Sequence, residues 1–223
     1  MPLVQGVVTL HFVVSFMLQP FDRVFEHYVW LEQAFAPAEC DRIIAHGETC
    51  GLSPAAVSEP VTRPGASGPT VVAAAARPRH RTAARDADLV FLGITPETTW
   101  IYQRLGEVIE NANRRFWQFE LDSCELVQFT RYRKGQFHAW HMDLGVVGDE
   151  RRRKLSLTVQ LSDPARYSGG DLEFMGPERT VAASRSRGAV AIFPTYMFHR
   201  VTPVTEGLRY ALVCWAFGRA PLT

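Results

Sequence analysis

The chain has 223 residues, of which 47% are hydrophobic, 21% charged and 11% aromatic. This mixture is typical of a globular domain and excludes a wholly disordered, collagen-like or coiled-coil protein. With 24 Lys and Arg against 23 Asp and Glu, the net charge of +1 gives no electrostatic basis for strong binding to nucleic acid or to an anionic membrane.

The first part of the chain is apolar from Leu3 to Leu18. No basic residue precedes this stretch and no cleavage site follows it, so it does not read as a signal peptide, and it is too short and too polar to span a bilayer. We expect a strand or a loose arm here, with Met17 as an alternative start of the chain.

The cysteines are widely spaced and form no CxxC pair, which argues against a disulfide scaffold or a zinc ribbon. Reduced thiols in a cytoplasmic protein are the expected state of all four, Cys40, Cys50, Cys124 and Cys214.

Two helices are expected in the N-terminal half. The first begins at Pro37, with acidic residues in its first turn, and runs to about Gly47. Proline and glycine then interrupt residues 51–81, where we expect a long loop or two weak strands that could close over a substrate. The second helix is expected from Thr95–Glu97 to about Arg115, because its apolar residues follow a helical spacing.

Beyond Phe116 the chain consists of short β-rich runs separated by Gly or Pro turns. Such a series predicts a sandwich or a barrel. The runs are residues 121–132, 155–161, 171–174, 180–183, 189–193, 202–204 and 209–217. We expect one domain over residues 1–223, in which an arm, helices and a loop at 1–119 support a β core at 120–218.

Three residues of this β-rich half are candidate metal ligands. His141 and Asp143 are two apart, so on a strand both side chains point to the same face. His199 adds a second imidazole from a distant segment. Two imidazoles and one carboxylate match the facial triad of non-haem Fe(II) sites, which leaves positions open for substrate and O₂. A structural zinc site would be closed and usually rich in sulfur.

A candidate anion site accompanies these ligands. Arg209 lies on an apolar β-rich run, where a guanidinium needs an anionic partner and suits a carboxylate. Tyr132 could donate a second hydrogen bond to the same anion.

Two further residues lie close to the candidate ligands in sequence. His138 is three residues before His141 and should face away from it on a regular strand. We expect a structural role for His138, with contact to substrate as the alternative. Trp140 is expected in the core or at the rim of the site, again with substrate contact as the alternative.

Over about residues 121–218 these motifs resemble the iron(II)/2-oxoglutarate dioxygenases. They are most similar to the prolyl-hydroxylase-like group and its small bacterial PKHD-type members. The matching elements are Tyr132-x-x-Gly135, His141-x-Asp143, Gly169-Gly-Asp and His199-x-x-x-Pro203-Val204-x4-Arg209. The resemblance implies an α+β protein with a mainly β core, a double-stranded β-helix of jelly-roll, cupin-like type, supported by N-terminal helices.

The resemblance also implies the site. Fe(II) would bind His141, Asp143 and His199, and the distal carboxylate of 2-oxoglutarate would bind Arg209 with Tyr132. Many members have Ser or Thr two residues after the arginine, whereas this chain has Ala211. We therefore expect Ser156 or Thr158, on an inward-facing strand, to supply the missing hydrogen bond to 2-oxoglutarate.

The implied reaction uses O₂ to hydroxylate an unactivated C–H bond and releases succinate and CO₂, with ascorbate as an optional reductant. An amino acid, a peptidyl residue or a natural product could be the substrate. Desaturation or ring formation on the same iron, nucleic-acid demethylation, and a non-catalytic cupin-like metal-binding module are the alternatives. Asp143 disfavours a halogenase, in which Gly or Ala replaces this carboxylate. A membrane partner is not expected, nucleic acid is disfavoured, and the sequence does not specify the oligomeric state.

Overall fold

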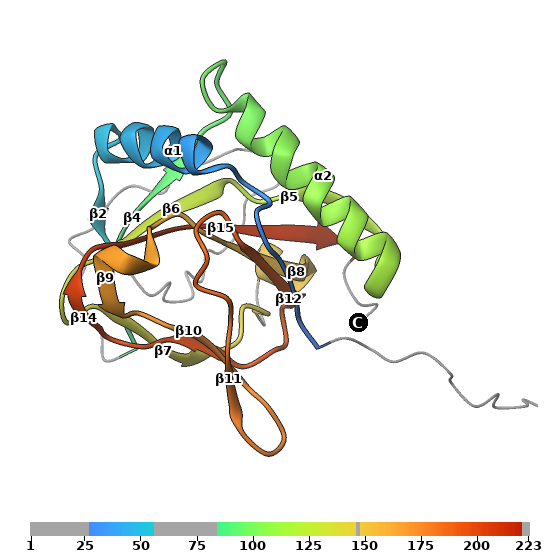
Figure 1. The fold of residues 1–223 in the computed structure, drawn as a ribbon. Helices are drawn as coiled ribbons and strands as arrows, with labels where there is room; N and C mark the ends of the chain where they lie inside the picture. Colours follow the sequence, from blue (N-terminus) through green and yellow to red (C-terminus); the bar gives the residue numbers. More distant parts are fainter. Residues whose placement is uncertain (1–26, 56–83, 146–147, 220–223) are drawn as a thin grey trace, which may run out of the picture.

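The computed structural model describes residues 27–55, 84–145 and 148–219 (Figure 1). The predicted arm at Leu3–Leu18, the alternative start at Met17 and most of the 51–81 loop lie outside these ranges. Within them, no helix is long and apolar enough to cross a membrane.

Two α-helices form where they were predicted, α1 (Pro37–Thr49) and α2 (Thr99–Phe116). Pro37 occupies the first turn of α1, and the Glu39 carboxylate accepts a hydrogen bond from the Ala36 backbone N–H at 2.7 Å. α2 begins later than predicted because the Thr98 hydroxyl donates to the Gly93 carbonyl at 2.6 Å, which holds the preceding turn outside the helix.

The larger of two main sheets has eight strands and is antiparallel throughout. Its order is β1 (Val29–Leu31), β12 (Val190–Pro194), β8 (Arg153–Gln160), β15 (Arg209–Gly218), β6 (Val127–Tyr132), β4 (Asp88–Leu92) and β2 (Ser53–Pro54), and β5 (Leu121–Cys124) also pairs with β15. The predicted run 121–132 is thus broken into two strands, β5 and β6.

The second sheet has five strands, in the order β11 (Thr180–Ala182), β10 (Leu172–Met175), β13 (His199–Val201), β7 (Phe137–His141) and β3 (Arg85–Asp86). A two-stranded ribbon of β14 (Val204–Gly207) and β9 (Tyr167–Gly169) completes the β structure, with 3-10 turns η1 (Gly148–Arg152) and η2 (Pro164–Arg166). Of the predicted run 202–204, residues 202 and 203 connect β13 to β14, and Val204 is the first residue of β14.

The two sheets form a double-stranded β-helix, which confirms the predicted fold class. β1 to β4 precede residue 120 and pair with these sheets, so the β structure draws on more of the chain than residues 120–218.

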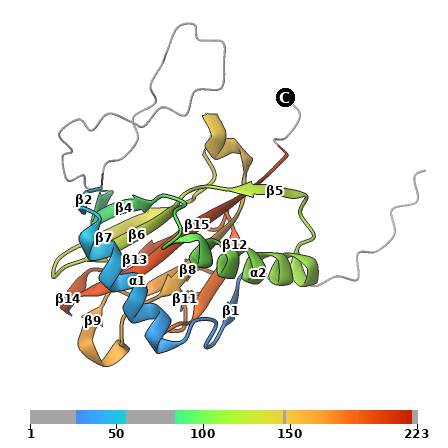
Figure 2. The same ribbon diagram turned by 90° about the horizontal axis from the view of Figure 1, so that it is seen from above.

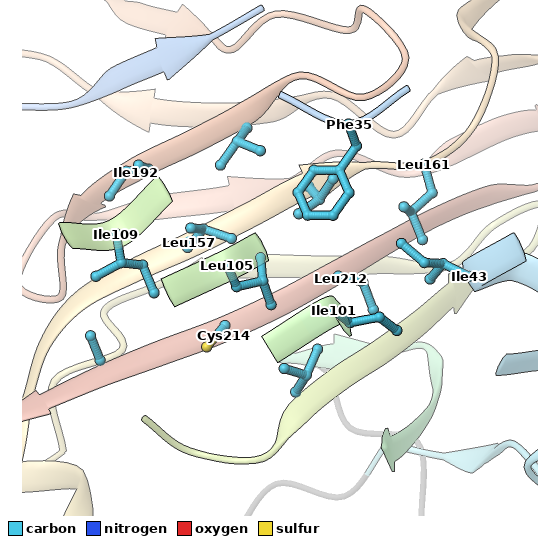
Figure 3. Packing of buried hydrophobic residues seen from close by; sticks show 14 of the residues in the cluster. Phe35, Ile43, Ile101, Leu105, Ile109, Leu157, Leu161, Ile192, Leu212 and Cys214 are labelled. Carbon is cyan, nitrogen blue, oxygen red and sulfur yellow. The ribbon is translucent and has the colours of Figure 1, made fainter. Parts of the chain in front are cut away.

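The two helices lie together over the outer face of the large sheet (Figures 1 and 2). Side chains alternate along each strand, so the large sheet presents an apolar face to the helices. On β8, Leu155, Leu157 and Val159 face the helices, whereas Ser156 and Thr158 between them face the other sheet. The helix-side cluster is shown in Figure 3. A second apolar cluster lies between the sheets, and the polar residues of the inner face are left to build a site there.

One glycine fixes how closely α1 approaches the sheet. A Cβ on Gly47 would lie 2.5 Å from the Phe129 ring, whereas a Cβ on Gly106 of α2 would meet open space. We expect Gly47→Ala to lower the free energy of unfolding by about 1–3 kcal/mol through overpacking. Gly106→Ala is expected to raise it by about 0.5–1 kcal/mol, because alanine favours the helix. Urea denaturation of both variants measures the free energy of unfolding. Equal changes in the two variants would contradict the close contact of α1 with the sheet at Gly47.

Candidate functional site

A cavity of about 450 Å³ lies between the two sheets. The large sheet contributes Arg209, Ala211, Val213 and Trp215, the inward-facing residues of β15. The small sheet contributes His141 from β7 and His199 from β13, and Asp143 follows β7. Side chains alternate along each strand, so the inward-facing residues of the two sheets meet in one cavity although they are far apart in sequence.

Among the residues that the structure describes, His141, Asp143 and His199 form a group able to hold a metal ion. Their ligand atoms all lie within 4.8 Å of one another. His141 Nε2 is 3.4 Å from Asp143 Oδ1, and His199 Nε2 is 3.6 Å from Asp143 Oδ2. His141 and His199 are direct cross-strand partners in the β7–β13 pair, which brings the two imidazoles together. The three predicted ligands therefore lie together at one site.

Local hydrogen bonds fix the tautomers of both histidines. His141 Nδ1 lies 2.8 Å from the Ala139 carbonyl, and His199 Nδ1 lies 2.9 Å from the Met197 carbonyl. A carbonyl only accepts hydrogen bonds, so each Nδ1 carries a proton, and Nε2 is the atom of each ring that is left to bind a metal. This second contact is typical of metal-ligating histidines. The donor set of two imidazoles and one carboxylate fits Fe(II).

Asp143 is held in its ionised form. Its burial opposes ionisation, but the neighbouring His199 and His141 and the hydrogen bond from Ser156 outweigh burial and lower the pKa of the carboxyl. Burial in turn lowers the pKa of His199 and favours its neutral form, although Asp143 acts against this. An ionised carboxylate beside a neutral imidazole is the protonation state that a metal needs.

The structure gives Ser156 a different contact from the predicted one. Its hydroxyl donates to Asp143 Oδ2 at 2.6 Å, and the residue is fully buried and does not line the cavity. The hydroxyl is therefore committed to the carboxylate and positions it. Thr158, the alternative, is buried and lines the cavity, so it stays a candidate for contact with 2-oxoglutarate.

Ser156→Ala is expected to weaken Fe(II) binding by about 10- to 100-fold, the range for loss of a partner that orients a metal ligand. Thr158→Ala, on the same face of the same strand, is the matched control and should leave iron affinity unchanged. Anaerobic titration calorimetry with Fe(II) measures both. Equal iron affinity of wild type and Ser156→Ala would contradict the positioning role.

The expectation that His138 faces away from His141 is wrong. The β7–β13 pairing aligns His199 with His141 but Val201 with His138, so β7 carries an extra residue between its two histidines. Such a bulge reverses the alternation and turns both rings to the same face. The rings stack with centroids 3.5 Å apart, and His138 lines the cavity. Burial, followed by the nearby His141, lowers the pKa of His138 and keeps it neutral.

Trp140 does not reach the cavity. It is absent from the cavity lining, and the Arg200 guanidinium lies over its ring at 4.7 Å. The Arg200 Nε atom in turn donates to Glu173 Oε2 at 2.6 Å. This stacked arrangement gives Trp140 a packing role, and the alternative of substrate contact finds no support.

At the deeper end of the cavity lies Arg209. The residue is 0% exposed, and its Nη2 donates to Gln160 Oε1 at 2.9 Å. Its Nε and Nη1 are buried and have no hydrogen-bond partner within the described part of the chain. A buried cation without an anion is costly, so these two N–H groups suit a carboxylate brought by a ligand. Tyr132 is its direct neighbour across β6–β15, and the guanidinium lies 5.3 Å from the centre of that ring.

Two features of the cavity were missed from the sequence. Gln160, the partner of Arg209, shares the inward face of β8 with Thr158, so strand alternation could have found it. In the cavity wall, Arg153 pairs with Glu125 at 2.6 Å and lies 4.2 Å from the centre of the Trp215 ring. No sequence pattern indicated that these three residues would come together.

Comparison with known proteins agrees with this geometry. Residues 127–217 match the family model described as the 2OG-Fe(II) oxygenase superfamily. Within residues 127–217 the chain is therefore similar to this superfamily. The resemblance seen in the sequence is thereby confirmed, and the family implies Fe(II) and 2-oxoglutarate as cofactor and co-substrate.

Curated relatives that match part of this chain carry the name PKHD-type hydroxylase. One from Maricaulis maris is 40% identical over 86 residues, which cover 39% of this chain and 39% of the relative. One from Synechococcus elongatus is 33% identical over 125 residues, covering 53% of this chain and 56% of the relative. The match spans less than two thirds of either relative.

The fold is also similar to solved structures. A prolyl hydroxylase from Trichoplax adhaerens, in complex with a hypoxia inducible factor peptide fragment, has a TM-score of 0.64 at 13% identity. The similarity covers 86% of this chain and 83% of that one. At this level of identity the comparison establishes the fold alone.

Proposed function

We propose that this protein is an Fe(II)- and 2-oxoglutarate-dependent hydroxylase. One observation carries the proposal. N–H groups of the buried Arg209 that have no partner among the described residues lie in the same cavity as the His141, Asp143 and His199 group. The three ligand residues would hold Fe(II), and Arg209 would bind the distal carboxylate of 2-oxoglutarate. A cupin-like module that only binds metal has no use for a buried arginine beside its metal ligands, so this alternative is disfavoured.

When bound, Fe(II) and 2-oxoglutarate supply the activation of O₂ and the oxidative decarboxylation that yields succinate and CO₂. The protein's own residues would bind the metal and the co-substrate and hold them in position. Arg209 neutralises one carboxylate, Tyr132 and Thr158 flank the same space, and Ser156 keeps the Asp143 carboxylate in place. The cavity sequesters the reacting groups between two sheets, which limits the access of water.

We propose a small molecule or a peptidyl residue as the substrate. The solved Trichoplax enzyme carries a peptide, and the PKHD-type relatives are named hydroxylases. The near-neutral net charge disfavours nucleic acid, as expected from the sequence. A cytoplasmic location stays a prediction.

Purified protein loaded with Fe(II) is expected to convert 2-oxoglutarate to succinate slowly without substrate and faster with one. Succinate release, with and without ascorbate, measures turnover, and a gain of one oxygen atom in a substrate library identifies hydroxylation. A loss of two hydrogen atoms would instead indicate desaturation or ring formation. Iron binding with no succinate under any of these conditions would favour the binding module.

A further inference from the structure

Two thiols lie on neighbouring strands of the large sheet, on the side away from the cavity. Cys124 is the last residue of β5 and stands opposite Ala216 of β15. Cys214 is two residues before Ala216, so both thiols project from the same face as diagonal neighbours. Cys214 belongs to the apolar cluster below α2 (Figure 3).

The two thiols differ in reactivity. Cys124 is exposed, whereas Cys214 is buried. A hydrogen bond between them lowers the pKa of Cys124 to about 7, against the opposing effect of burial, and raises the pKa of Cys214. The thiolate is the reactive form of cysteine, so Cys124 is the group that an oxidant would attack and Cys214 the neighbour that would follow.

Cys40 provides a contrast within the same chain. It lies fully buried in α1, and burial raises the pKa of its thiol to about 11. Cys50, at the end of α1, donates its thiol hydrogen to the His46 carbonyl at 3.3 Å. Both serve as internal controls for selective oxidation.

We propose that Cys124 and Cys214 are a thiol pair that hydrogen peroxide oxidises to a disulfide. The Cys124 thiolate attacks one peroxide oxygen, the O–O bond breaks, and hydroxide leaves and takes up a proton to form water. The Cys214 sulfur then displaces the hydroxyl of the resulting sulfenic acid, forming the S–S bond and a second water. Peroxide takes up two electrons and the two thiols lose them.

Closing this bond must move the end of β5. The Cα atoms of diagonal neighbours are usually about 7–8 Å apart. A disulfide needs about 4.4–6.8 Å. β5 ends at Cys124 and the strand order resumes only at Val127, so this end can be drawn toward β15.

The residues that follow the two cysteines belong to the cavity. Glu125 and Trp215 both line it, and the Glu125 backbone N–H donates to the Trp215 carbonyl at 2.9 Å. Glu125 also pairs with Arg153, which stacks on Trp215. We therefore expect the disulfide to displace this group in the cavity wall and lower oxygenase turnover several-fold. This consequence rests on the proposed function, whereas the disulfide itself does not.

The bond is tested by mass, independently of activity. The metal-free full-length protein is treated with hydrogen peroxide at neutral pH, then freed of peroxide, alkylated and digested with trypsin. The expected product links the peptide of residues 116–131 to that of residues 210–219, and dithiothreitol abolishes it. Cys124→Ser and Cys214→Ser should each lose the product, while Cys50→Ser should keep it. Absence of the linked peptide in the wild type would overturn the proposal.

The effect of the disulfide on oxygenase turnover, here called the coupling, is tested separately. Oxidised wild type, reloaded with Fe(II), should release succinate several-fold more slowly than the same sample after dithiothreitol, and Cys124→Ser should show no such difference. Equal rates of the oxidised and reduced wild type, with the linked peptide present, would overturn the coupling but leave the thiol pair. A protein without turnover in either state would contradict the proposed function and leave the mass result intact.

Discussion

Replacing any one of His141, Asp143 and His199 by alanine is expected to remove Fe(II) from the protein and to abolish succinate formation. Each residue would contribute one of only three protein ligands, and their ligand atoms lie within 4.8 Å of one another. Loss of an outer partner of a ligand typically costs about 10- to 100-fold in metal affinity, so loss of a ligand itself should exceed about 100-fold. Anaerobic titration calorimetry and metal analysis after desalting measure this.

His138 offers a matched control in the same cavity. Its imidazole stacks on His141 but does not belong to the His141, Asp143 and His199 group. His138→Phe keeps an aromatic ring in the stack and removes both nitrogen atoms, so this variant should retain iron. Unchanged iron affinity in all three alanine variants would contradict the assignment. So would a loss of iron in His138→Phe as complete as in His199→Ala, because His138 would then be a ligand.

Local patterns predicted much of the fold and of the site. The apolar spacing of Ile101, Leu105 and Ile109 gave α2 and its buried face. The spacing of two residues correctly indicated that His141 and Asp143 lie together, although β7 ends at His141 and Asp143 lies just beyond it. The two-residue period of β8 correctly turned both Ser156 and Thr158 inward. These features depend only on residues close in sequence.

Features that depend on distant pairing could not be predicted. The bulge that turns His138 toward His141 exists because β13 has one residue fewer between the paired positions, and no local motif records this. Ser156 contacts Asp143 because the register of β8 brings its hydroxyl within 2.6 Å of the carboxylate. β2 and β3 are two residues long, too short to have a period of their own, and form only through their partners.

Arg209→Ala is expected to keep iron and to raise the Michaelis constant for 2-oxoglutarate strongly. The three candidate ligands are untouched, whereas the co-substrate carboxylate would lose its charged partner in a fully buried position. Truncation of one member of a buried charge pair costs about 2–5 kcal/mol. This corresponds to roughly 30- to several-thousand-fold in affinity.

More conservative substitutions should raise the Michaelis constant for 2-oxoglutarate less than Arg209→Ala does. Arg209→Lys keeps the charge but not the planar fork, so it should recover part of the loss. Tyr132→Phe should cost less than either, about 1 kcal/mol, because it removes one neutral hydrogen bond. Arg104→Ala, on the exposed face of α2, is the matched control and should leave the constant unchanged.

Steady-state succinate release at varied 2-oxoglutarate concentrations measures the ranking, and iron content is determined in the same samples. Parallel losses of iron and activity in Arg209→Ala would indicate that the variant has lost its fold rather than its anion site, and Arg209→Lys, the closer substitution, then decides. Wild-type affinity for 2-oxoglutarate in a folded, iron-loaded Arg209→Ala protein would contradict the anchor. The bond from Nη2 to Gln160 would then not be part of a 2-oxoglutarate site, and the N–H groups of Nε and Nη1, which have no partner among the described residues, would have to bind another anion.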